Sequence, residues 1–273
     1  MLALVSRLVK LSLRLYNCHC NDSFATCLTS NYKGYTIKEQ YFFSTVFKLN
    51  LTTMNHPART IFQDEIVKLQ AFVLELAHKV QANGELMLEF LQEKNKMSEV
   101  FLKIKEKDKE IDKARWQVHD YGDELIVLQQ PVANDFRQII ASIQTTDNLE
   151  RIGDHFKKTA RLFEKVSITD IEVPEEIVNM AKLGLKMLAQ ATDAYAKMLD
   201  GNPNQIASLD EEVNLLYKKT IKKIIELVKH APEEKVDALT KLFFIAQSFE
   251  RAADHAAKIG ETVNYAITGK RGK

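Results

Sequence analysis

Apolar residues recur at intervals of three and four along most of the chain, which is the pattern of amphipathic helices. One such series is formed by Phe136, Ile139, Ile140 and Ile143. The pattern predicts six long helices, over residues 62–92, 95–129, 132–167, 174–200, 204–230 and 233–267. No segment gives a persuasive strand pattern, so we expect an all-α fold.

Prolines separate the predicted helices. Proline is favoured in the first turn of a helix, where its missing N–H needs no partner, but it breaks a helix interior. We therefore expect a helix to begin close to each of the five prolines, Pro57, Pro131, Pro174, Pro203 and Pro232.

The chain also contains an internal repeat. The window LERIGDHFKKTARL at Leu149 aligns without a gap with FERAADHAAKIGET at Phe249, and DKEID at Asp108 aligns with DEEVN at Asp210. Each half therefore has a long helix, a second helix carrying D-x-x-x-[DN] and a third carrying E-R-x-x-D-H, which predicts two antiparallel three-helix bundles. We place the repeats at 60–168 and 172–268, followed by a basic tail at 269–273.

Residues 1–54 differ from the rest of the chain. Their first stretch, MLALVSRLVKLSLRLY, is interrupted by three basic residues, so it predicts a basic amphipathic helix rather than a membrane span or secretory signal. All three cysteines lie in this segment, which leaves the body without a disulfide framework and suits a reducing compartment. We interpret 1–54 as an N-terminal extension or a mis-assigned start, and expect 1–53 to be dispensable for folding.

The charge balance argues against a nucleic-acid partner. The chain has 38 Lys and Arg residues against 37 Asp and Glu residues, a formal net charge of +1. Because basic residues outnumber acidic ones in 1–54, the body itself is slightly acidic. We expect no nucleic acid to bind this surface.

Paired carboxylates are the candidate chemistry. Residues four apart share one helix face, so Asp108 with Asp112 and Glu150 with Asp154 form two acidic patches. Asp108 also falls on an apolar seam, where a carboxylate needs a partner. A hard or intermediate cation such as Mg²⁺, Mn²⁺ or iron would relieve both the repulsion between the carboxylates and the cost of removing them from water. The alternative is that these acids are solvated or paired with Lys and Arg.

Three aromatic side chains receive structural interpretations. His155 and His255 could add nitrogen ligands, but each lies about 100° around its helix from the neighbouring Asp. A hydrogen-bonded position at the edge of the core is favoured for each. Trp116, the one tryptophan, is predicted to be part of the core.

The segment QQPVANDFRQIIASIQTTDNLERIGDH, followed by LFFIAQSFERAADH, resembles the two signature blocks of the PhoU family of bacterial phosphate-uptake regulators. The resemblance covers 60–268 and includes a Q-P-V-A-x-D-x-R segment, formed by Gln130, Pro131, Asp135 and Arg137. It implies two three-helix bundles whose acidic motifs hold metal ions, commonly iron or zinc. The implied metal ligands are Asp108, Asp112, Glu150, Asp154, Asp210, Glu250 and Asp254.

The resemblance also implies a function. Members of the family are regulators without an established reaction, which repress phosphate-starvation signalling by linking the phosphate ABC transporter to a membrane sensor histidine kinase. We therefore expect a cytoplasmic, non-enzymatic negative regulator that associates with the membrane through its partners. A homodimer is the expected assembly.

The second repeat departs from the family pattern. Asn214 replaces the second acid of its motif, and Gln247 stands where the first repeat has Asp147. Lys158 and Lys258 occupy positions where family blocks often have asparagine, and they bring positive charge near the acidic surface. We expect the second metal site to be the weaker one.

Two other classes of function stay open. A di-metal carboxylate oxidase or iron-storage bundle needs Glu-x-x-His pairs, and neither Glu150 nor Glu250 has histidine three residues later. A purely structural helical scaffold would leave the repeated acids as surface charge. The sequence has no glycine-rich phosphate loop, nucleophile elbow or zinc-type Cys/His spacing.

Overall fold

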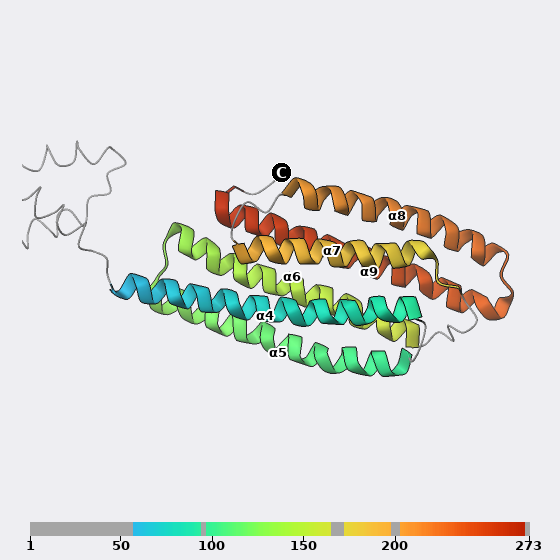
Figure 1. The fold of residues 1–273 in the computed structure, drawn as a ribbon, viewed down its shortest axis with the longest axis horizontal. Coiled ribbons are helices and arrows are strands. Elements are labelled where there is room, and N and C mark those ends of the chain that lie inside the picture. Colours follow the sequence, from blue (N-terminus) through green and yellow to red (C-terminus); the bar gives the residue numbers. More distant parts are fainter. Residues whose placement is uncertain (1–56, 94–96, 165–171, 198–202, 271–273) are drawn as a thin grey trace, which may run out of the picture. The chain divides into compact units, whose positions relative to one another are not determined.

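The computed structural model describes residues 57–93, 97–164, 172–197 and 203–270, and all their regular structure is helical (Figure 1). The helices are α4 (Pro57–Glu93), α5 (Met97–Gln129), α6 (Ala133–Glu164), α7 (Glu175–Lys197), α8 (Pro203–Lys229) and α9 (Glu233–Thr268). The predicted all-α class with six long helices is confirmed, with bounds that differ by a few residues. The extension at 1–54, the helix ends predicted at 167 and 200, and the tail beyond 270 lie outside the described residues.

The helix starts follow the prolines. Pro57 and Pro203 are the first residues of α4 and α8, and Pro174 and Pro232 immediately precede α7 and α9. Pro131 lies two residues before α6. The proline spacing therefore locates every described helix start except that of α5.

The turn between α5 and α6 has an unusual backbone. Gln130 and Ala133 adopt positive φ angles of 45° and 42°, which residues other than glycine rarely do. Just beyond it, Arg137 Nε donates a hydrogen bond to the Ala266 carbonyl oxygen at 3.3 Å. A cation is favoured there because the last carbonyls of α9 carry partial negative charge. The Q-P-V-A-x-D-x-R segment thus ties the start of α6 to the end of α9.

Each repeat is a three-helix bundle, and the two bundles meet along α6 and α9 (Figure 1). In the first repeat α5 packs on α6, and in the second α7 and α8 both pack on α9. Edge-to-face ring contacts pack α4 against its neighbours. The Phe72 ring contacts Tyr121 of α5, with centroids 5.4 Å apart, and the Phe90 ring contacts Phe163 of α6, with centroids 5.3 Å apart.

Equivalent residues of the two repeats meet at the α6–α9 contact. The rings of His155 and His255 lie with their centroids 5.8 Å apart. A residue that contacts its own equivalent lies next to a local twofold axis. The repeats are therefore related by an approximate twofold axis close to this histidine pair.

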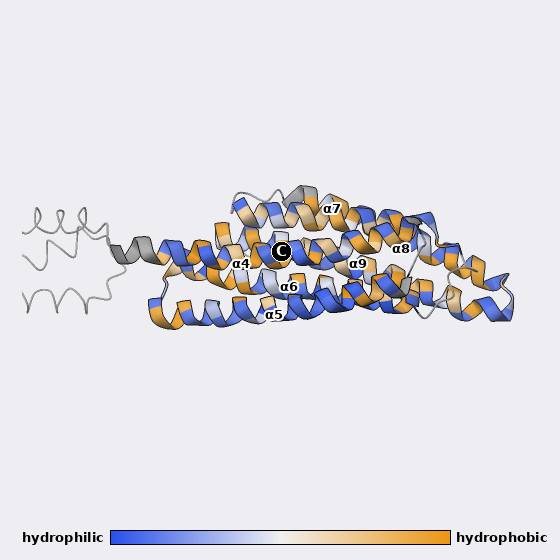
Figure 2. Ribbon diagram, turned by 60° about the horizontal axis from the view of Figure 1, so that its bottom comes forward, coloured by the Kyte–Doolittle hydropathy of each residue, from blue (hydrophilic) through white to orange (hydrophobic). Residues whose placement is uncertain are grey.

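The apolar seam predicted for α5 is part of the core. Ile104, Ile111 and Val118 are fully buried, while the outer side of α5 is largely hydrophilic (Figure 2). The prediction that Trp116 is a core residue is wrong, because 58% of its surface is exposed. It lies on the side of α5 opposite Val118 and packs against the Arg115 guanidinium, 5.2 Å from the ring centroid. None of the described helices has the length and apolarity that a membrane span requires.

Gly84 marks a close approach of α4 to α6 and α7. A Cβ atom there would collide with Leu185 Cδ2 and lie 2.9 Å from the Phe156 ring. Gly84→Ala is therefore expected to lower the free energy of unfolding by about 1–2 kcal/mol. At Gly184 an added Cβ would meet no atom within 4 Å, so Gly184→Ala should raise it by about 0.5–1 kcal/mol. Urea unfolding of both variants checks this, and shifts of the same sign would contradict it.

Candidate functional site

The acidic motifs of α5 and α6 lie together at the surface of the first repeat. Asp108 projects from the apolar row of α5 and is only 5% exposed, whereas Asp154 on α6 is half-buried. Their negative charges act on each other, and that of Asp112 adds to them. Antiparallel packing of the second and third helices thus juxtaposes these two carboxylates.

The Lys157 ammonium lies between the two carboxylates. Its Nζ is 2.6 Å from Asp108 Oδ2 and 2.8 Å from Asp154 Oδ1. Burial alone would lower the pKa of Lys157, but its hydrogen bonds to both carboxylates raise that pKa well above the usual range. The lysine is therefore charged at any physiological pH and has the position and charge of a bridging cation.

Asp108 depends on this lysine. Burial raises the pKa of Asp108 above its usual value, while the hydrogen bond and charge of Lys157 act in the opposite direction. A carboxylate in an apolar row is strongly destabilising without a partner. Asp108, on the apolar seam of α5, thus has its partner within the same chain, namely Lys157.

Other acids of the first repeat also have cationic neighbours. Asp147 Oδ1 accepts a hydrogen bond from Arg115 Nε at 2.9 Å and lies 2.9 Å from His119 Nε2. Glu150 lies 3.6 Å from Arg151 Nε, and its pKa is raised, chiefly by burial. Asp112, in contrast, is exposed on α5.

The acidic cluster of the second repeat has no corresponding lysine, because Ala257 occupies the position of Lys157. Asn214 Nδ2 donates to Asp210 Oδ2 at 3.1 Å, and burial raises the pKa of Asp210. Arg251 lies 3.7 Å from both Glu250 and Asp254. Burial and the charge of Asp254 also raise the pKa of Glu250.

The first repeat does not fit a metal site, because Lys157 already holds the place between its carboxylates. Across the described residues, no group of three or more His, Cys, Asp or Glu side chains is arranged to hold a metal ion. In the second repeat, carboxylate oxygens suited to a hard cation are present without an internal ammonium group. Arg251 lies beside two of these carboxylates, so each cluster has a cationic neighbour, and the order of the two cation sites stays a prediction.

The two histidines at the local twofold axis have different partners. His255 Nδ1 lies 2.9 Å from Asn148 Oδ1, whereas His155 Nδ1 is buried and has no hydrogen-bond partner among the described residues. Ser248 holds the position equivalent to Asn148, but its hydroxyl donates to the Phe244 carbonyl oxygen instead. The expected hydrogen-bonded position is therefore found for His255 and not for His155.

Both imidazoles are disfavoured in their charged form. Burial, the neighbouring His255 and the charge of Lys158 lower the pKa of His155 to about 4. Burial and the charge of Lys258 likewise lower the pKa of His255. The charges of Lys158 and Lys258 thus each help to keep one imidazole of the pair neutral.

Sequence reasoning missed Lys157, the residue that decides the chemistry of the first repeat. The signal was present: Lys157 and Ala257 differ in charge within two otherwise similar blocks. Lysine lies three residues after Asp154, so it shares that residue's helix face. A comparison of the two blocks position by position would have found it.

These features define a class of protein: a duplicated three-helix bundle with acidic motifs on the second and third helices of each repeat. The PhoU domain family matches residues 73–163 and again residues 177–263. The chain belongs to the PhoU family, and the resemblance proposed from its signature blocks is confirmed.

The chain is similar to named members of this family. It is 30% identical over 214 residues to a Zymomonas mobilis protein, covering 77% of this chain and 88% of that one. It is 27% identical over 216 residues to a Clostridium acetobutylicum protein, covering 78% and 97%. Both are named phosphate-specific transport system accessory protein PhoU homolog.

Two crystal structures share the fold. The phosphate transport system regulatory protein PhoU from Streptococcus pneumoniae superposes with a TM-score of 0.71 at 28% identity, covering 78% of this chain and 99% of that one. PhoU from Pseudomonas aeruginosa gives a TM-score of 0.70 at 24% identity, covering 77% and 100%. The second likeness concerns the fold alone.

Proposed function

We propose that this chain is an accessory regulator of a phosphate transport system. The observation that carries the proposal is the match of the PhoU domain family to both repeats, together with relatives named as phosphate-specific transport system accessory proteins. In this role the chain is a negative regulator of phosphate uptake and phosphate-starvation signalling. It acts as an adaptor between the phosphate ABC transporter and a sensor histidine kinase, as the family resemblance implies.

The proposed regulator is not an enzyme. It works in the cytoplasm as a homodimer and reaches the membrane through its partners. The rival di-metal oxidase or iron-storage bundle needs Glu-x-x-His pairs, in which histidine lies three residues after Glu. Gly153 and Ala253 hold those positions, and both are buried in the packed core.

Cation binding is part of the proposal for the second repeat alone. Asp210, Glu250 and Asp254 are the residues that would hold an iron, zinc, manganese or magnesium ion there, because their oxygens suit such ions. Arg251, which lies 3.7 Å from both Glu250 and Asp254, would have to move away from them. Lys157 removes the need for a metal ion in the first repeat.

Deleting the gene is expected to leave a phosphate-starvation reporter switched on in phosphate-rich medium, because repression would be lost. The full chain, and a chain that starts at Met54, should restore repression to the level before deletion. Reporter fluorescence in rich and in phosphate-limited medium measures both effects. The regulatory role fails if the reporter stays silent after deletion in a strain where phosphate limitation still induces it.

A further inference from the structure

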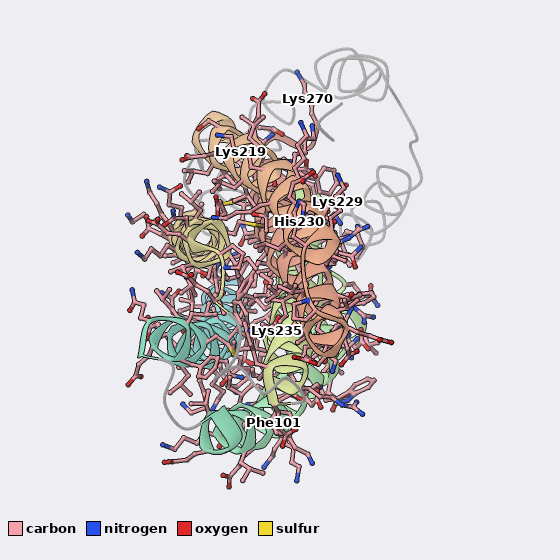
Figure 3. All side chains as sticks on the ribbon, turned by 90° about the vertical axis from the view of Figure 1, so that its right-hand side faces the viewer. Phe101, Lys219, Lys229, His230, Lys235 and Lys270 are labelled. Carbon is pink, nitrogen blue, oxygen red and sulfur yellow. The ribbon has the colours of Figure 1, made fainter. Side chains whose placement is uncertain are left out.

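A groove of about 910 Å³ lies beside the ion-paired Lys157, between α5 and α6. Phe101, labelled in Figure 3, lies on the part of α5 nearest its N-terminus, and Glu164 lines the groove at the C-terminal end of α6. Six cationic side chains face three carboxylates in this groove. The cations are Lys105, Lys109, Arg151, Lys157, Lys158 and Arg161.

Most of this positive charge is not neutralised within the described part of the chain. Lys157 is held by Asp108 and Asp154, and Arg151 lies 3.9 Å from Asp154 Oδ2. The other four cations, Lys105, Lys109, Lys158 and Arg161, are exposed and form no ion pair with another described residue. Lys105 and Lys109 are four residues apart on α5, and Lys158 and Arg161 are three residues apart on α6. The two cations of each pair therefore lie on the same face of their helix.

The second repeat has lost or reversed most of this positive charge at the equivalent positions. The basic residues Lys105, Lys109 and Arg161 are replaced there by Ala207, Glu211 and Glu261, which are all exposed. Ala257 replaces Lys157, and Lys158 alone of the five is kept as lysine, at 258. Two surfaces with a common ancestor and the same helical frame thus differ in the sign of their charge. A general need for solubility would not produce this difference at only one of them.

We propose that the groove between α5 and α6 of the first repeat binds a small molecule that carries a chain of phosphate groups. Lysine and arginine are the side chains that recognise phosphate oxygens, and four such groups without an ion pair match a ligand with several adjacent negative charges. The groove volume lies in the range of small-ligand sites. Asp108 and Asp154 also line this groove, but Lys157 is ion-paired with both of them, and the site does not depend on the regulatory role.

Isothermal titration calorimetry of the full chain in EDTA tests the site, with inorganic triphosphate and ATP as the two probes. EDTA ensures that no divalent ion bridges the ligand to a carboxylate. Triphosphate should bind with a stoichiometry of one, and Lys109→Glu with Arg161→Glu should weaken it about tenfold or more. These substitutions introduce the residues that the second repeat has at 211 and 261, so the fold already accommodates them there. Circular dichroism and melting curves confirm that the double variant is folded.

A matched control changes the net charge equally on another helix. Lys182→Glu with Lys186→Glu reverses two exposed lysines four residues apart on α7, and should leave the affinity within about twofold. If triphosphate and ATP bind with comparable affinities, the groove recognises the phosphate chain alone. If ATP binds more tightly, the protein also contacts the nucleoside. The proposal is overturned if neither probe binds, or if both double variants weaken binding equally. It is also overturned if hexaglutamate binds more tightly than triphosphate, which would assign the groove to an acidic protein segment.

Discussion

Replacing Lys157 by alanine, the residue at the equivalent position 257, is expected to lower the free energy of unfolding by about 2–3 kcal/mol. Asp108 would stay buried next to Asp154 while losing the ammonium group 2.6 Å away. This value lies at or below the lower end of the range of about 3–5 kcal/mol for broken buried ion pairs, because the lysine side chain is 34% exposed and partly screened by solvent. Urea unfolding in EDTA at pH 7 measures the change.

The same substitution should create a cation site in the first repeat. Mn²⁺ is expected to restore much of the lost stability of Lys157→Ala, because it can replace the ammonium between the carboxylates. Ala257→Lys is the reciprocal variant and should abolish any Mn²⁺ response of the second repeat. Lys182→Ala on α7 serves as the control for loss of one exposed positive charge. A Lys157→Ala chain as stable in EDTA as this control would show that the buried pair is unimportant.

Local features of the sequence were sufficient to predict the helices. The preference of proline for the first helical turn and the spacing of apolar residues are properties of a few neighbouring residues, so the helix bounds could be derived without tertiary contacts. The internal repeat then placed the acidic motifs on adjacent helices. Lys157 of α6 forms ion pairs with both Asp108 of α5 and Asp154 of α6, so the acidic motifs of the two helices do lie together.

Side-chain partners were harder to predict, because they depend on the rotation of one helix against another. Lys157 and Lys158 are neighbours in sequence, yet they point about 100° apart and only Lys157 reaches the carboxylates. Trp116 was assigned to the core from its residue type, although it falls on the opposite side of α5 from the buried row. Both errors arise from weighing residue type above position on the helix face.

The buried histidine pair is expected to lower the free energy of unfolding as the pH falls. The pKa of His155 is about 4 in the folded chain, against 6.5 for an unperturbed imidazole. Between these values the unfolded chain binds more protons, so the stabilising contribution is present above about pH 6.5 and is lost as the pH falls toward 4. The groups that face the pair from α6 and α9 are Asn148, Arg151, Asp154, Lys158, Arg251, Asp254 and Lys258.

Substituting His155 by phenylalanine is expected to remove about 2 kcal/mol of this acid destabilisation between pH 7 and pH 4. Linkage sets an upper bound of about 3 kcal/mol, which we reduce because the ring is only partly shielded from solvent. The buried Asp108 and the half-buried Glu250 act in the opposite sense, since their raised pKa values add stability as the pH falls. The quantity to compare is therefore the native-minus-variant difference in free energy of unfolding at each pH. His78→Phe, at an exposed position on α4, is the matched control. If the native-minus-variant difference for His155→Phe stays constant from pH 7 to pH 4, the buried imidazole does not control acid stability.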